Sequence, residues 1–160
     1  MSVLVPGKKA PAFKLPSTSG EIVTLATLKG ASAVLYFYPK DDTSGCTREA
    51  IDFTGLAKDF KKAGTRVLGV SPDSIGKHKK FIVKHELGLE LLADETKEML
   101  EAFGVWKEKS MYGRKYMGVE RTTVLIDPAG KVVRVWEKVK VHGHAQEVLE
   151  AAKALNKSLK

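Results

Sequence analysis

One continuous apolar run, residues 33–38, constrains the fold of this chain more than any other feature. Its sequence, Ala-Val-Leu-Tyr-Phe-Tyr, is far too short to span a membrane and offers no charged side chain to water. Such a run is typical of a β-strand that is buried on both faces, as in a parallel sheet with helices on each side. Pro39 ends the strand, because proline donates no hydrogen bond to a neighbouring strand.

Other β-prone segments alternate with amphipathic ones along the chain. The turn sequence Asp-Pro-Ala-Gly between two of them predicts an antiparallel hairpin near the C-terminal end. This order predicts one α/β domain over residues 1–160, with a mixed central sheet flanked by helices and an N-terminal β-hairpin. The expected strands are 13–15, 22–25, 66–71, 89–93, 122–126 and 131–136, and the expected helices are 47–64, one from about 74 that carries Phe81 and Ile82, 96–103 and 144–155.

The charge of the chain is basic but evenly spread. It carries 27 Lys and Arg against 19 Asp and Glu, a net charge of +8, and the excess is almost all lysine. A nucleic-acid-binding protein more often gathers its basic residues and relies on arginine, so we interpret these lysines as a solvated surface. The densest group, within residues 107–115, has the same interpretation. We expect no nucleic-acid partner.

The sequence contains no apolar stretch of the length that a signal peptide or a membrane span requires. We therefore expect a cytoplasmic protein that does not enter a membrane.

The chain has a single cysteine, Cys46, which excludes an internal disulfide and a metal site built from several thiolates. His142 and His144 flank a glycine, but two histidines without a nearby carboxylate or thiolate are weak grounds for a metal. We expect solvated or capping histidines there, surface positions for His78 and His85, and no metal or cofactor.

Cys46 lies between the buried strand and the helix that follows it. A helix N-terminus carries a partial positive charge and unpaired N–H groups, both of which favour the thiolate form of a cysteine. Gly45 allows backbone or substrate to approach closely, and Thr43 places a hydroxyl near the thiol. The alternative is an inert buried cysteine, which is the usual role of a free cysteine. Asp41 and Asp42, beside Lys40, are interpreted as a solvated loop.

The pattern Pro39-x-x-x-Thr43-x-x-Cys46 resembles the active-site motif of the peroxiredoxins, and its surroundings are similar to the bacterioferritin comigratory (PrxQ) branch of that family. Further similar segments follow in the same order along nearly the whole chain. They are Gly-Val-Ser-Pro-Asp at 69–73, Leu-Leu-Ala-Asp at 91–94 and the stretch 111–123 that contains Arg121. The resemblance implies a thioredoxin-like fold and a thiol-dependent peroxidase that reduces hydrogen peroxide and organic hydroperoxides.

The resemblance also implies a role for each motif residue. Cys46 is the peroxidatic cysteine, which becomes a sulfenic acid, and Thr43 binds the peroxide through its hydroxyl. Pro39 walls the pocket, Arg121 faces the thiolate and the peroxide, and Glu49 orients that arginine. Each has a plainer alternative: a turn or capping hydroxyl for Thr43, a strand end for Pro39, a surface charge for Arg121 and an acid in the first helical turn for Glu49.

The chain departs from the branch at three positions. Ser44 stands where proline is usual, and the two places where a second, resolving cysteine occurs in the branch hold Ile51 and the apolar segment around Ile82. We therefore expect a one-cysteine mechanism, in which thioredoxin, glutaredoxin or glutathione reduces the sulfenic acid, or in which two copies form a transient disulfide through Cys46. A monomer is expected otherwise.

Two alternative functions remain on the same fold. A thiol–disulfide oxidoreductase needs Cys-x-x-Cys, and Thr43 stands where the first of those cysteines belongs. A basic, non-enzymatic binding or chaperone module is the other alternative.

Overall fold

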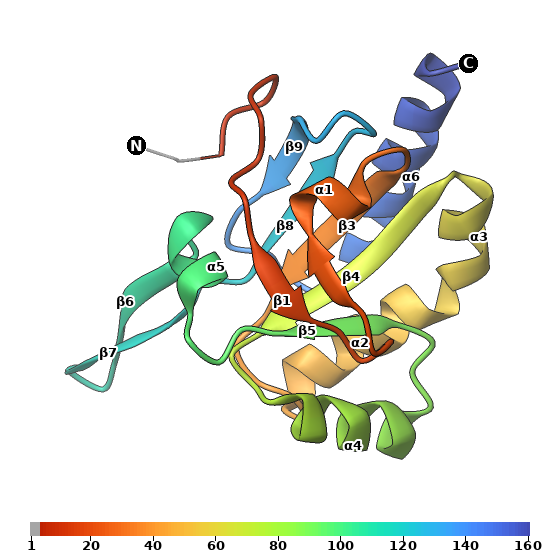
Figure 1. Cartoon of the computed structure of the whole chain (residues 1–160). Coiled ribbons are helices and arrows are strands. Elements are labelled where there is room, and N and C mark those ends of the chain that lie inside the picture. Colours follow the sequence, from red (N-terminus) through yellow and green to blue (C-terminus); the bar gives the residue numbers. More distant parts are fainter. Residues whose placement is uncertain (1–3) are drawn as a thin grey trace.

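A five-stranded sheet forms the centre of the protein, which we describe for residues 4–160 of a computed structural model (Figure 1). The strand order is β5-β4-β3-β8-β9; β3, β4 and β5 are parallel, and β8 is antiparallel to both of its neighbours. The apolar run supplies the middle strand, all of whose residues are buried as predicted. The strands are β3 (Ser32–Phe37), β4 (Thr65–Ser71), β5 (Glu90–Ala93), β8 (Thr122–Ile126) and β9 (Val132–Trp136).

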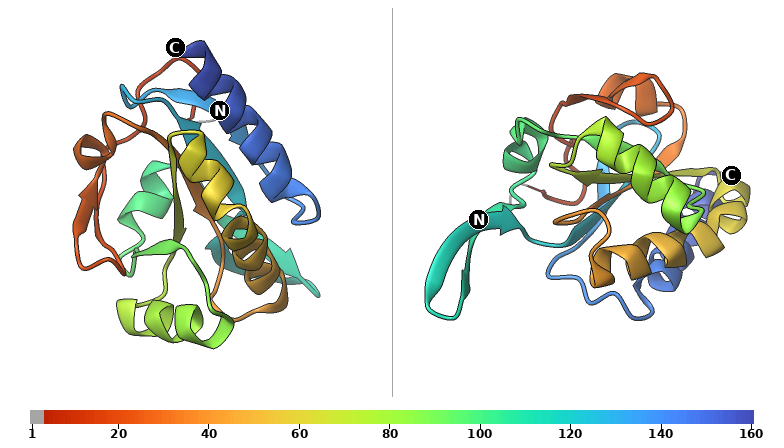
Figure 2. Two further views of the ribbon diagram at one scale, coloured as in Figure 1. Left: turned by 90° about the vertical axis from the view of Figure 1, so that its right-hand side faces the viewer. Right: turned by 90° about the horizontal axis from the view of Figure 1, so that it is seen from below.

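Helices cover both faces of this sheet (Figure 2). They are α1 (Leu25–Leu28), α2 (Ser44–Gly55), α3 (Ala57–Lys62), α4 (Ile75–His85), α5 (Glu98–Ala102) and α6 (His144–Ser158). Successive side chains of a strand point to opposite faces, so β3 contributes to two cores. Val34 and Tyr36 pack with α2, α3 and α6, whereas Leu35 and Phe37 pack with α1 and α5.

The two predicted hairpins are present. At the N-terminal end, β1 (Lys14–Pro16) pairs antiparallel with β2 (Ile22–Thr24) and lies over the face that α1 and α5 also cover. At the other end of the chain, β8 and β9 pair antiparallel around a turn in which the Asp127 carboxylate accepts the N–H groups of Ala129 and Lys131. The prediction of a mixed sheet flanked by helices, with an N-terminal hairpin, is confirmed.

The long helix predicted at residues 47–64 is wrong in its extent. It begins earlier, at Ser44, and it is broken into α2 and α3 at Leu56, whose ψ of 7° departs from helical geometry. The apolar spacing continues across the break because both helices pack against the same core. The early start places Cys46 within the first turn of α2.

A third hairpin, formed by β6 (Trp106–Met111) and β7 (Arg114–Val119), was not predicted. It projects from the body of the protein as a two-stranded arm (Figures 1 and 2). Most of its residues are exposed or half-buried, so the strands lack the alternation of apolar and polar residues that marks a half-buried strand. The prediction of a basic surface at 107–115 was right for Lys107, Arg114 and Lys115, whereas Lys109 is half-buried, and the pairing of the segment as strands was missed.

Within residues 4–160, no helix combines the length and the apolar composition that crossing a membrane requires.

Candidate active site

Cys46 lies in the first turn of α2, directly after the loop of residues 38–43 that follows β3; we call this segment the β3–α2 loop. Its side chain is only 2% exposed. The sulfur accepts a hydrogen bond from Arg121 Nη2 at 3.3 Å. A guanidinium N–H beside the sulfur suits a thiolate, the form in which a cysteine is a nucleophile.

Arg121 reaches the cysteine because of the sheet topology. It immediately precedes β8, and the first residue of β8, Thr122, pairs with Phe37 at the end of β3. The end of β3 and the start of β8 therefore lie side by side, and a side chain just before β8 stands over the start of α2. Gly45 leaves room for it, since a Cβ atom there would lie 3.3 Å from Arg121 Nη2. The predicted close approach at Gly45 is thus an approach of the guanidinium.

Glu49 completes a buried group with Cys46 and Arg121, which we call the thiol cluster. It lies one turn further along α2, and its Oε1 accepts a hydrogen bond from Arg121 Nη1 at 2.5 Å. Burial raises the pKa of Glu49 to about 7, although the Arg121 guanidinium opposes that rise. Burial lowers the pKa of Arg121, but Glu49 and then Cys46 outweigh it and raise the pKa above its ordinary value. Among the described residues, Oε2 of Glu49 has no hydrogen-bond partner.

Thr43 and Pro39 lie in the β3–α2 loop. Thr43 is the residue before the first turn of α2, but its side chain does not cap the helix; its hydroxyl donates to the Lys40 carbonyl at 2.9 Å, within the loop. The Thr43 side chain is exposed, and Pro39 is half-buried two residues beyond the end of β3. The structure thus brings Cys46, Glu49 and Arg121 into direct contact, with Thr43 and Pro39 on the loop that leads to the cysteine.

Lys109 is a neighbour of the thiol cluster that the sequence did not single out. Burial and then the Arg121 guanidinium lower the pKa of Lys109, while Glu120 and Cys46 act in the opposite direction. The ammonium therefore lies within electrostatic range of the sulfur, although Lys109 is part of β6 in the projecting arm, where it pairs with Tyr116. The one signal in the sequence was the concentration of basic residues at 107–115, which we interpreted only as surface.

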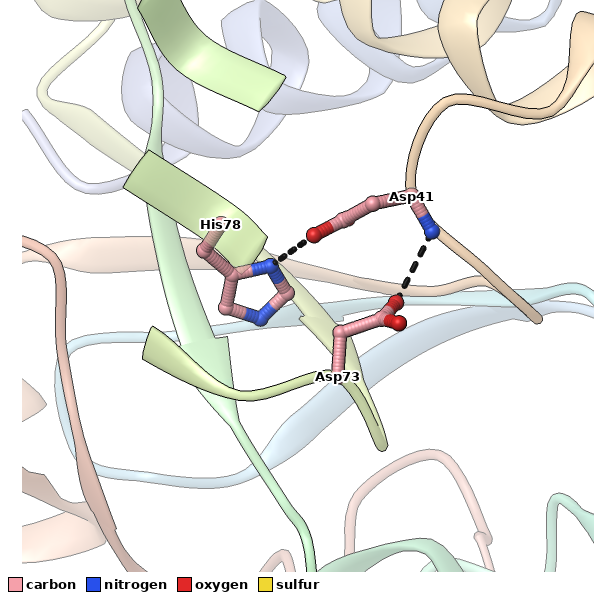
Figure 3. A group of neighbouring side chains, drawn as sticks. All are labelled: Asp41, Asp73 and His78. Atoms are coloured by element: carbon pink, nitrogen blue, oxygen red, sulfur yellow. Dashed lines mark hydrogen bonds and ion pairs between the residues drawn. The ribbon is translucent and has the colours of Figure 1, made fainter. Parts of the chain in front are cut away.

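A second polar group, the histidine cluster, consists of Asp41, Asp73 and His78 and lies beside the β3–α2 loop (Figure 3). All three side chains are buried, and one ligand-type atom from each lies within 4.8 Å of the others, a set that could in principle hold a metal ion. In the structure these atoms form hydrogen bonds with one another and with their surroundings. The predictions of a solvated Asp41 and a surface His78 were therefore wrong, because each supplies the other with a buried partner.

The prediction for His144 was also wrong. Its side chain is 5% exposed and Nε2 lies 2.8 Å from the Thr123 hydroxyl, between the rings of Phe53 and Trp136. Burial lowers the pKa of His144 to about 4. His142 is exposed, as expected. The exposed position and the buried one are only two residues apart, so the local sequence did not distinguish them.

Comparison with known proteins defines the class of this enzyme. Residues 6–135 match the AhpC/TSA family, so the chain belongs to that family. Within it, the chain is 47% identical to the peroxiredoxin Bcp of Bacillus subtilis over 94% of its own length and 96% of that protein. It is likewise 47% identical to the peroxiredoxin Bcp of Xanthomonas campestris, over 91% of this chain and 92% of that one.

Solved structures lead to the same class as the sequence comparisons. A structure of the Xanthomonas campestris bacterioferritin comigratory protein, studied for its alkyl peroxide reduction activity, has a TM-score of 0.87 and 43% identity and covers 98% of this chain and 99% of that one. The resemblance to the peroxiredoxins and the thioredoxin-like fold are thereby confirmed. The chain is a thiol-dependent peroxidase, with a peroxide as substrate and a thiol as reductant.

Proposed function

We propose that Cys46 is the peroxidatic cysteine of this peroxidase and that Arg121, Thr43, Glu49 and Pro39 form its peroxide site. The contact of Arg121 Nη2 with the Cys46 sulfur at 3.3 Å carries this proposal, because it joins the only cysteine of the chain to a cation 75 residues away. Glu49 supports it by holding the other terminal nitrogen of the same guanidinium. The substrates are hydrogen peroxide and organic hydroperoxides.

In the reaction, the Cys46 thiolate attacks the terminal oxygen of the hydroperoxide. The S–O bond forms as the O–O bond breaks, the sulfur is oxidised to a sulfenic acid, and the departing oxygen leaves as an alkoxide or hydroxide that takes up a proton. Arg121 and the Thr43 hydroxyl stabilise the charge that develops on the departing oxygen. Pro39 helps to keep water from the reactive sulfur.

Two effects can accelerate the reaction, ionisation of the thiol and stabilisation of the departing oxygen, and their sizes differ. At a reference pKa of about 8.5, roughly 3% of a thiol is ionised at neutral pH, so full ionisation gains at most about 30-fold, or about 2 kcal/mol. A thiolate of lower pKa is also a weaker nucleophile. Stabilisation of the departing oxygen by Arg121 and its neighbours is therefore the larger contribution.

The catalytic cycle closes through another molecule. Since Cys46 is the single cysteine, its sulfenic acid is reduced by an external thiol from thioredoxin, glutaredoxin or glutathione, or forms a transient disulfide with Cys46 of a second copy. The two positions without a resolving cysteine, Ile51 and Ile82, lie on α2 and α4.

We further propose a single cytoplasmic domain over residues 1–160 that is a monomer outside that transient disulfide. The net charge of +8, which opposes self-association, supports the monomer.

Stopped-flow mixing of the reduced protein with hydrogen peroxide, and separately with an alkyl hydroperoxide, tests the proposal. We expect a fast second-order reaction that Cys46→Ser abolishes. In turnover with an external monothiol, two equivalents of thiol are consumed for each peroxide: the first forms a mixed disulfide with Cys46 and releases water, and the second releases the Cys46 thiol. Non-reducing electrophoresis after peroxide treatment tests the one-cysteine cycle, because any covalent dimer has to contain Cys46. A Cys46→Ser variant that still reduces peroxide at the wild-type rate would show that the assignment of Cys46 is wrong.

A further inference from the structure

His78, on α4, is a buried and titratable side chain to which the peroxidase proposal gives no role. It is 0% exposed, yet both of its ring nitrogens have partners. Nε2 lies 2.9 Å from the carbonyl oxygen of Leu92 on β5, and Nδ1 lies 2.6 Å from Asp41 Oδ2 in the β3–α2 loop (Figure 3). The ring therefore connects the sheet to the loop that leads to Cys46.

These partners hold the ring on both sides. The Leu92 carbonyl has no proton to donate, so Nε2 carries a hydrogen and donates it. On the other side of the ring, Asp41 Oδ1 accepts a hydrogen bond from the Tyr38 hydroxyl at 2.5 Å. The contact between Nδ1 and Asp41 Oδ2 is a second hydrogen bond of the ring, so both ring nitrogens are engaged, one by the sheet and one by the loop.

A second carboxylate fixes the same part of the loop. Asp73 Oδ2 accepts hydrogen bonds from the Asp41 backbone N–H at 2.8 Å and from the Ser71 hydroxyl at 2.7 Å. It thus fixes the backbone of the residue whose side chain contacts His78. The side chain and the backbone of Asp41 are therefore both held by buried partners.

The β3–α2 loop depends on such contacts because its conformation is unfavourable. Asp42, one residue before Thr43, has a φ of +60°, in the left-handed region that non-glycine residues seldom adopt. Its carboxylate is held by Lys84 at 2.6 Å and by His85 at 2.8 Å, both on α4. The side chains of Asp41 and Asp42 are therefore both fixed by α4, immediately before the residues proposed to bind the peroxide.

We propose that His78 is a positioning residue for peroxide reduction: through its hydrogen bond to Asp41 it holds the β3–α2 loop in the conformation that places Thr43 and Pro39 beside Cys46. This inference rests on the role proposed above for Cys46. His78 touches neither the peroxide nor the sulfur. It acts by orienting the groups that do, and small displacements of such groups lower reaction rates strongly.

The hydrogen bonds of His78 can be measured in the wild-type protein without any assay of activity. In NMR of the uniformly ¹⁵N-labelled chain, we expect a His78 ring N–H that exchanges slowly with solvent, because the ring is fully buried and hydrogen-bonded at both nitrogens. In Asp41→Asn, which removes the carboxylate but keeps the shape, the ¹⁵N shifts of the ring change. A His78 ring N–H that exchanges rapidly in the wild-type protein would overturn the inference even if the enzyme is fully active.

The positioning role is tested by kinetics in His78→Gln, with His142→Gln as the matched control at an exposed position. Two rates are measured for each variant: the stopped-flow reaction with hydrogen peroxide, and alkylation of Cys46 by iodoacetamide, which needs the sulfur but not a peroxide site. We expect peroxide reduction to fall about tenfold to hundredfold in His78→Gln, while alkylation stays the same or rises. The control retains both wild-type rates.

Each other outcome has a definite meaning. Equal losses of the two rates would show that the sulfur itself has changed, and a wild-type peroxide rate in His78→Gln would show that the loop does not need the histidine; both overturn the inference. If the wild-type protein fails to react with peroxide, the proposed role of Cys46 falls, whereas the NMR result on His78 stands independently.

Discussion

Two polar clusters, one that includes Asp41 of the β3–α2 loop and one at the start of α2, differ in how completely their atoms are paired. In the histidine cluster, both ring nitrogens of His78 and both carboxylate oxygens of Asp41 have partners. In the thiol cluster, Glu49 is equally buried, but one of its oxygens has no partner within residues 4–160. Buried polar groups are normally satisfied, so a paired cluster stabilises one conformation, whereas an incompletely paired one is free to interact with a substrate.

Their electrostatics differ in the same way. The thiol cluster gathers a cation, a carboxyl group with a raised pKa and a nucleophile around a site that changes charge during the reaction. The histidine cluster is joined by hydrogen bonds inside the protein and includes Asp41 of the loop. We therefore predict that substitutions in the thiol cluster lower the rate of peroxide reduction most, and that substitutions elsewhere near the loop act mainly by shifting the positions of the reacting groups.

The largest effect is expected from Arg121→Lys, which keeps the positive charge but removes the forked geometry that contacts both Cys46 and Glu49. We expect the second-order rate with hydrogen peroxide to fall about 10²- to 10³-fold in stopped-flow measurements. Arg48→Lys makes the same change at an exposed position of α2 and serves as the control. Unchanged kinetics in Arg121→Lys would mean that the arginine contributes only its charge.

The next effect is expected from Glu49→Gln, which retains the shape of the side chain but not its charge. The rate with peroxide should fall roughly tenfold, because the guanidinium is held less firmly. Stability should change as well. The pKa of Glu49 is about 7 in the folded chain against an ordinary value of 4.5, so folding favours the protonated form, and the free energy of unfolding falls as pH rises from 4.5 to 7.

Urea denaturation at several pH values measures the free energy of unfolding. The raised pKa of Glu49 corresponds to a change of about 3 kcal/mol at most in the wild-type protein, and this part of the pH dependence should disappear in Glu49→Gln. A variant with the same pH profile as the wild type would locate the titration elsewhere.

A smaller effect is expected from Gly45→Ala. The added Cβ would lie 3.3 Å from Arg121 Nη2, so the guanidinium has to move by a few tenths of an ångström. We expect peroxide reduction to slow roughly threefold to tenfold, with the thermal midpoint almost unchanged. Gly55→Ala, at the other end of α2, meets no atom within 4 Å and is the matched control. Equal rates in the two variants would show that the position of Arg121 tolerates this displacement.

The smallest effect is expected from Ser44→Pro, between the two clusters. Ser44 is the first residue of α2, a position where proline suits the helix and loses no internal hydrogen bond. We expect a gain of about 0.5 kcal/mol in unfolding free energy and no change in the peroxide rate. Thermal unfolding followed by circular dichroism measures the gain; a slower reaction would instead mean that the loop needs the freedom that serine allows.

The sequence predicted the elements whose burial leaves a regular local pattern of apolar residues. The apolar run of β3 is continuous because both faces are buried, and the position of Cys46 at the start of a helix follows from the change of pattern after Pro39. The role of Arg121 came from a resemblance between motifs, and its contact with Cys46 agrees with it.

The remaining features depend on contacts between distant residues. Asp41 and His78 are 37 residues apart, and each was interpreted as solvated because a lone charged residue normally is. Only the fold pairs them. The arm of β6 and β7 was missed for the opposite reason, since strands with little burial leave no apolar period in the sequence.

The antiparallel pairing of β3 with β8 has a practical consequence. The sulfur and its guanidinium come from segments 75 residues apart and meet only when the sheet is assembled. In the unfolded chain Cys46 is an ordinary thiol, which reacts with alkylating reagents but only slowly with peroxide. The ratio of these two reactivities therefore reports the fraction of native protein, and the chain carries a built-in, label-free probe of its own folding.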